Sequence, residues 1–117
     1  MVTLYDPLVV ALTTASRVDF VANPYNSVIQ NPTTATSAPV GVAMLATTSG
    51  YYGWIQTGGV GVVKADAGAA VTVGTSVVAS NGTAGCVEGE AGAQAPVGIA
   101  LTGIATGEFG TAHLTLD

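Results

Sequence analysis

Short runs of Val, Ile, Thr and Ala alternate with Gly, Pro and Asn along most of the chain. Short apolar runs bounded by turn-forming residues are typical of β-strands, and no stretch shows the 3.6-residue period and caps of an amphipathic helix. In residues 39–45, the side chains on both alternating faces are apolar or small. The pattern therefore predicts an all-β fold in which the strand at 39–45 is buried on both faces.

Part of this pattern occurs twice. The segment APVGVAM at 38–44 recurs 57 residues later as APVGIAL at 95–101. The same offset aligns SGYYG at 49–53 with TGEFG at 106–110. Two similar β units predict a small barrel or sandwich with an internal duplication, an arrangement that also removes exposed sheet edges.

Upstream of this match the two copies differ. A weaker echo, at an offset of 49, relates residues 27–35 to residues 76–84. The second copy therefore carries an insertion of eight residues, expected within 85–94. In the same region the dipeptide Asn81-Gly82 lies between two β-like runs, and this dipeptide favours a two-residue hairpin turn with positive φ at both positions.

Each copy is expected to form a hairpin. Residues 49–53 would make the first turn, and Trp54 would begin the returning strand. The second copy would turn at Thr106-Gly107 and return through the final apolar run. The aromatic residues that match between the copies, Tyr52 and Phe109, are expected to fill the core.

The beginning of the chain is not part of the repeat. We divide the sequence into residues 1–22, a first β repeat at 23–59 and a second β repeat at 60–117, and we expect one compact domain overall. Residues 1–22 form either a first pair of strands or an extended arm that lies on a neighbouring subunit. They show neither the basic start of an export signal nor an apolar run of about 20 residues, so we expect no transmembrane helix. Five apolar residues of this region are candidate interface residues: Leu4, Tyr5, Leu8, Val9 and Val10.

The composition points toward assembly with other proteins. Hydrophobic residues make up 49% of the chain and charged residues only 8%, whereas about 25% charged residues is usual for soluble domains. A surface so poor in charge is most easily kept soluble when part of it is covered by other chains. The net charge of −5, with Arg17 and Lys64 isolated from other basic residues, disfavours binding to nucleic acid or to an anionic membrane.

Candidates for catalysis or metal binding are few. The single histidine, His113, is expected on the more polar face of the last strand, and the chain has no Gly-x-Ser-x-Gly sequence for a nucleophile. Cys86 is expected to be a buried apolar residue, and Glu88 and Glu90 a solvated sheet edge. The run at 58–64 lacks the spacing of a phosphate loop and is interpreted as a glycine-rich bend. We therefore predict a non-enzymatic protein without metal or cofactor.

Two aromatic residues are candidates for an interface. Tyr51 and Trp54 correspond in the second copy to the polar residues Glu108 and Thr111. Tyr and Trp anchor many interfaces because each buries a large area and keeps a polar group. The alternative is that both rings form a stacking platform for a glycan, in a ligand-binding module of a fibre or adhesin.

The runs at 73–80, 96–101 and 105–116 resemble the small capsid decoration (cement) proteins of tailed bacteriophages, which are similarly rich in Ala, Gly, Val and Thr. The resemblance is best over residues 60–117 and looser over 38–57. It implies a β-barrel or sandwich module, made in the host cytoplasm and located on the outer surface of the virion capsid. Such a protein would stabilise the shell by bridging subunits of the major capsid protein, as a homo-oligomer such as a dimer or trimer.

Overall fold

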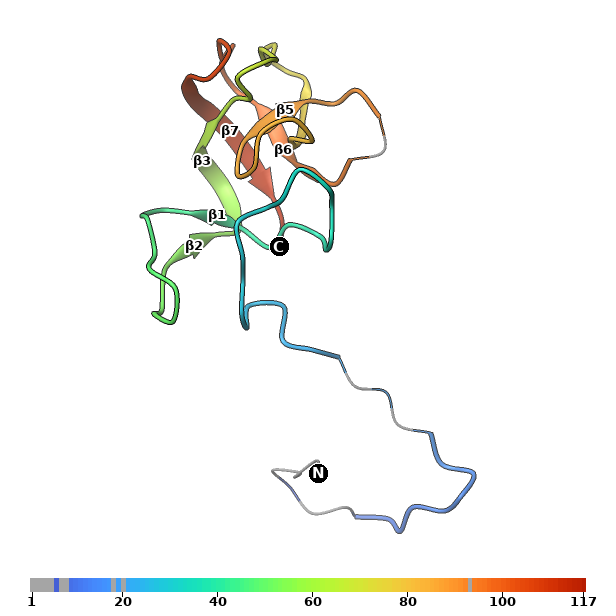
Figure 1. Ribbon diagram of the computed structural model, residues 1–117. Helices are drawn as coiled ribbons and strands as arrows, with labels where there is room; N and C mark the ends of the chain where they lie inside the picture. Colours follow the sequence, from blue (N-terminus) through green and yellow to red (C-terminus); the bar gives the residue numbers. More distant parts are fainter. Residues whose placement is uncertain (1–5, 7–8, 18, 20, 93) are drawn as a thin grey trace.

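The computed structural model describes residues 6, 9–17, 19, 21–92 and 94–117 (Figure 1). Three of the candidate interface residues, Leu4, Tyr5 and Leu8, lie outside the described residues. Over the described residues the secondary structure consists of strands and no helix, which confirms the all-β prediction. The strands are β1 (Val42–Ala43), β2 (Ile55–Gln56), β3 (Gly58–Lys64), β4 (Ser76–Ala79), β5 (Val87–Gly89), β6 (Pro96–Ala100) and β7 (Phe109–Thr115).

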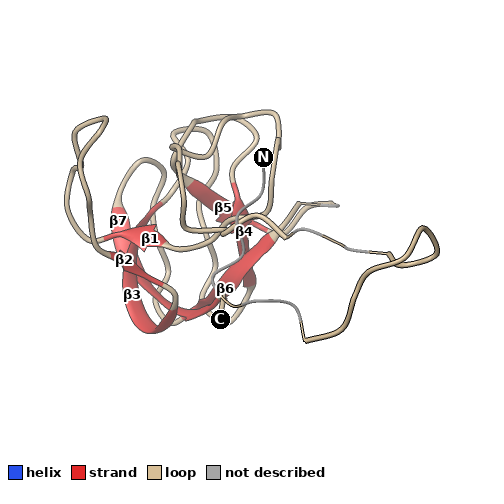
Figure 2. Cartoon of the chain, turned by 90° about the horizontal axis from the view of Figure 1, so that it is seen from below, coloured by secondary structure: helices blue, strands red, loops and turns tan. Residues whose placement is uncertain are grey.

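The strands form two antiparallel sheets. The larger has the order β3-β7-β6-β4-β5, and β1 and β2 form a separate two-stranded sheet. The strands of the larger sheet curve around a common interior (Figure 2). Its two outer strands approach one another just beyond β3, where a single parallel bridge joins Ala65 to Val87 and the Asp66 N–H donates to the Val87 carbonyl at 2.8 Å. One bridge, rather than a ladder, links these two edges.

The hydrophobic core lies entirely under the larger sheet. Strand alternation produces it, because every second residue of β7 faces inward and the residues between face solvent. The boundary predicted between residues 59 and 60 falls within β3, which pairs along its whole length with β7 of the second repeat. The core consists of Val63, Ala65, Val71, Val77, Val87, Val97, Ala100, Ile104, Ala112 and Leu114.

β4 and β5 pair as the sequence predicted, but their connection differs. The prediction of a two-residue turn at Asn81-Gly82 is wrong, because the connection covers residues 80–86 and its left-handed residue is Gly85, with φ 72°. The reason is the buried side chain of Ser80. Its hydroxyl donates to the Asp66 carboxylate and accepts the N–H groups of Gly82 and Thr83 at 3.0 Å, which holds the loop in a wider form.

Two other local predictions are corrected by the structure. Residues 58–64 form strand β3 and not a bend, and the side chain of Leu114 occupies the space that a Cβ on Gly61 would need. The strand expected at 39–45 shortens to Val42–Ala43 and is not buried on both faces, since Met44 and Leu45 are exposed. Among the residues that the structure describes, no second layer covers this hairpin, so the apolar pattern alone did not lead to burial.

The described part of residues 6–22 contains no strand and is exposed to solvent. It leads away from the sheets as an extended arm (Figure 1). The radius of gyration is 18.2 Å, whereas a compact chain of this length would have about 13 Å. The described residues of this region therefore form an extended arm and no first pair of strands, and its contact with a neighbouring subunit stays a prediction.

Candidate interaction surface

The two copies of the repeat form hairpins with the same register. The hairpin of β1 and β2 and the hairpin of β6 and β7 contain equivalent pairs of opposed residues. In the first these are Val42 with Gln56 and Ala43 with Ile55; in the second, 57 positions later, they are Ile99 with His113 and Ala100 with Ala112. The repeated sequence therefore corresponds to a repeated three-dimensional unit.

The turns of the two hairpins also match. A backbone bond of 3.1 Å closes each turn, and the glycine at its tip, Gly50 or Gly107, has a left-handed φ of 82° or 74°. In each hairpin a second glycine leaves room for the side chain six residues before it: Gly53 for Thr47, and Gly110 for Ile104. The closing bonds run from Tyr51 N–H to the Thr48 carbonyl and from Glu108 N–H to the Ala105 carbonyl.

Apolar side chains face solvent at the same positions in both hairpins. Tyr52 is fully exposed and its counterpart Phe109 is 68% exposed, so the prediction that they fill the core is wrong. The reason is strand phase, because Phe109 shares the outward face of β7 with His113 while the inward positions are held by the core. Met44 and its counterpart Leu101 are also large, apolar and exposed.

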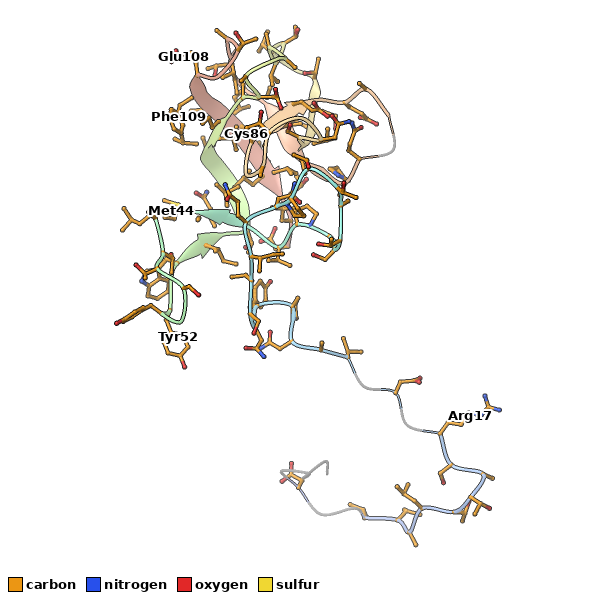
Figure 3. All side chains as sticks on the ribbon, viewed as in Figure 1. Arg17, Met44, Tyr52, Cys86, Glu108 and Phe109 are labelled. Carbon is orange, nitrogen blue, oxygen red and sulfur yellow. The ribbon has the colours of Figure 1, made fainter. Side chains whose placement is uncertain are left out.

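Three of these residues lie along one side of the molecule. In Figure 3, Phe109, Met44 and Tyr52 project from the same side, the first from β7 and the others from the smaller hairpin. The outward face of β3 continues the apolar surface with Val60 and Val62, both exposed. We call the exposed side chains of Met44, Tyr52, Trp54, Val60, Val62, Leu101 and Phe109 the apolar strip.

The candidate residues Tyr51 and Trp54 lie together at the smaller hairpin. Both rings are exposed, Trp54 to 86%, and they line an open hollow of about 300 Å³ together with Tyr52, Gly53 and residues 45–48. Val9 and Val10, also predicted for an interface, are exposed on the arm and do not join this cluster. The structure thus brings together the two aromatic candidates and leaves the described arm candidates apart from them.

His113 is exposed on β7, as predicted, with Val60 and Ile99 opposite it on the neighbouring strands. Lys64 adds a positive charge next to the strip, with its Nζ 5.6 Å from the centre of the Phe109 ring, a distance at which a cation–π interaction is favourable. His113 also lines an open hollow of about 520 Å³ with Thr57, Thr115 and Asp117.

Cys86, Glu88 and Glu90 lie on or directly beside β5. Cys86 is buried, as predicted. Glu88 is only 8% exposed, so the prediction that it forms a solvated edge is wrong. Its carboxylate accepts the Gln94 side-chain amide at 2.8 Å and the Asn81 N–H at 3.4 Å, while Glu90 is exposed. The carboxylate of Glu88 thus helps to hold the loops on either side of β5.

The described ranges contain no group of three or more His, Cys, Asp or Glu side chains placed to hold a metal ion. Within the same ranges, no helix has the length and apolar character needed to cross a bilayer. No protein-family model, curated protein or solved structure matches this chain.

Proposed function

We propose that this chain is a structural virion protein that binds the outer surface of a phage capsid and stabilises the shell by bridging neighbouring subunits of the major capsid protein. One observation carries the proposal: two pairs of apolar residues of the strip, Met44 with Leu101 and Tyr52 with Phe109, are exposed at equivalent positions of the two duplicated hairpins. Folding does not require apolar residues there, because those positions are outside the core. A partner that covers both hairpins gives a physical reason for this pattern.

The strip suits a broad, shallow contact. Burying a large apolar side chain contributes about 1.5–3 kcal/mol, so a single hairpin would bind weakly once the entropy of association is subtracted. Two similar hairpins in one rigid unit can bind two neighbouring copies of the same capsid protein. The second contact then forms at a high effective concentration, which converts two weak contacts into stable bridging. With charged residues at only 8% of the chain, such binding would depend little on salt.

Co-sedimentation with expanded, DNA-free capsids of the phage that encodes the chain tests this proposal. The wild-type protein should co-sediment with the capsids. Tyr52→Ser and Phe109→Ser should each weaken binding about tenfold, and the double variant should weaken it by more than either, because both contacts are then lost. Val73→Ser is the control, since Val73 is also a large apolar residue exposed to solvent but belongs to neither hairpin. Unchanged capsid binding by the double variant would refute the proposal.

A second function has an observation of its own. Tyr51 and Trp54 are exposed beside a hollow that also includes the hydroxyl-bearing Thr47 and Thr48, an arrangement that suits stacking of a sugar ring. The chain would then be a glycan-binding module of a fibre or adhesin. Titration with a panel of oligosaccharides, followed by Trp54 fluorescence, separates the two. A saturable change that Tyr51→Ala abolishes, in a protein that does not bind capsids, would favour the glycan-binding function.

A further inference from the structure

We infer that residues 27–30 of one copy of this chain pair as an antiparallel strand with the open edge of β1 in a second copy. The first repeat would thereby gain the strand that β4 supplies in the second repeat. This interface between copies concerns the edge of the smaller sheet and is independent of the apolar strip and of capsid binding.

The open edge follows from comparing the two hairpins. β6 is flanked by β7 on one side and β4 on the other, whereas β1, its counterpart, has only β2 beside it in the described structure. The backbone groups of Ala100 face β4, since its N–H donates to Thr75 at 3.0 Å and its carbonyl accepts from Gly74 at 2.8 Å. The matching groups of Ala43 therefore face outward on β1, ready to accept a strand.

The sequence of the missing strand is present in the chain. β4 begins with Ser-Val-Val, and residues 27–29, in the weaker echo, read Ser-Val-Ile. In the second repeat Ser76 lies opposite Ile99 and Val77 opposite Gly98. Applied to the first repeat, this register places Ser27 opposite Val42 and Val28 opposite Gly41. Gly41 lies close to β2, with the Gln56 carbonyl 3.1 Å from the position of an added Cβ, and the equivalent carbonyl of His113 lies closer still to Gly98.

Residues 27–30 do not fill this position within their own chain. They form no strand, and Val28 and Ile29 are exposed. The segment is instead attached to the loop after β4, where the Gln30 amide donates to the Ala84 carbonyl at 3.2 Å and the Asn31 carbonyl accepts the Gly85 N–H at 2.9 Å. This attachment leaves the two exposed apolar residues available to a second copy.

Ser27 gives a further reason to expect a change of pairing. Its φ is 59°, and it is the one non-glycine residue of the described chain with a left-handed backbone. L residues rarely adopt this conformation because the Cβ crowds the following carbonyl oxygen. Extension into a strand would relieve that crowding at the first residue of the segment. An exchange in which each copy donates one strand and accepts one can close into a symmetric dimer or ring.

Disulfide trapping tests the register in the full-length chain. Ser27→Cys and Val42→Cys are made in separate chains on a Cys86→Ala background and mixed under mild oxidation. By analogy with Ser76 and Ile99, these two residues form a non-hydrogen-bonded pair, whose short separation permits a disulfide. The mixture should yield the heterodimer. The matched control is Val28→Cys mixed with Val42→Cys, in which the neighbouring side chain points to the other face and should give at least tenfold less product.

Light scattering at micromolar concentration provides the second readout. The wild-type protein should be oligomeric, and Val28→Pro should shift it to monomer because proline removes the N–H that the register assigns to the Gly41 carbonyl. Val21→Pro, at an exposed position outside the segment, should leave the mass unchanged. A monomeric wild type would overturn the inference. So would a Ser27→Cys/Val42→Cys double variant that forms its disulfide only within one chain, which would show closure without a second copy.

Discussion

Substitution of two leucines tests whether the hydrophobic core lies in the second repeat alone. Leu114 on β7 is 1% exposed and lies in the centre of the core, whereas Leu45, next to β1 in the first repeat, is 78% exposed. Truncation of each to Ala removes the same atoms from two different environments. The difference between the two losses of stability then measures how unequally the repeats are packed.

The expected magnitudes follow from burial. Leu114→Ala should lower the free energy of unfolding by about 3 kcal/mol or more, since buried Leu→Ala changes leave a cavity that relaxes only in part. Leu45→Ala should change it by less than about 0.5 kcal/mol. The strands of the larger sheet and their loops span roughly 60 residues, for which a total stability of about 3–9 kcal/mol is usual. Leu114→Ala should therefore lower Tm by about 12 °C or more.

Far-ultraviolet circular dichroism during thermal and urea unfolding is the appropriate assay. Fluorescence of Trp54 is unsuitable, because this side chain is already exposed in the folded protein. A loss of stability in Leu45→Ala similar to that in Leu114→Ala would show that the first hairpin is packed against a second layer, and the division into a packed and an exposed repeat would be refuted. An m-value that is unchanged in both variants would confirm that the comparison concerns stability alone.

Two further predictions concern the backbone of β6 and the loop at Ser80. Gly98→Ala should prevent folding or lower Tm severely, because the added Cβ would meet the His113 carbonyl of β7. Gly103→Ala should be tolerated, since the atom nearest to an added Cβ lies 3.9 Å away. Expression levels and thermal melts distinguish the two variants. The pKa of Asp66 is held below its ordinary value of 3.8, mainly by the Ser80 hydroxyl and then by the Gly68 N–H. A lowered pKa in the folded state means that this carboxylate adds stability above about pH 4, and that this stability is lost as the pH falls through the folded-state pKa. Thermal melts between pH 2 and 7 should show a steeper acid loss in the wild type than in Asp66→Asn, and equal slopes would contradict this assignment.

Sequence alone predicted the features that depend on local pattern. The all-β fold and the repeated hairpin are encoded in runs of a few residues, and Gly50 and Gly107 both have a left-handed backbone because each closes the same turn. The phase of β7 was also readable. Phe109 alternates with Thr111, His113 and Thr115, which marks the polar, outward face and could have identified Phe109 as exposed.

The features that failed depend on contacts between distant residues. Asn81-Gly82 has the sequence of a tight turn, but Ser80 bonds to Asp66, 14 residues away, and this bond selects a wider loop. Glu88 was expected in solvent because it is charged, yet the Gln94 amide reaches over it and satisfies its carboxylate in a buried site. Neither partner can be found from the local sequence, since each lies on a different loop.

The two repeats differ in which residues face inward and outward. This difference explains how the same hairpin could pack within its own chain in the second repeat and contact another chain in the first. The inward positions held by Ile104 and Leu114 in the second copy are held by Thr47 and Thr57 in the first. Two threonines cannot replace the burial of an isoleucine and a leucine, so the first hairpin gains little from packing under a sheet of its own chain. Its outward positions have changed in the opposite direction, with Trp54 where the second copy has Thr111. A hairpin with threonines on its inner face and an added aromatic ring on its outer face is suited to contact with another chain, as the proposed function requires.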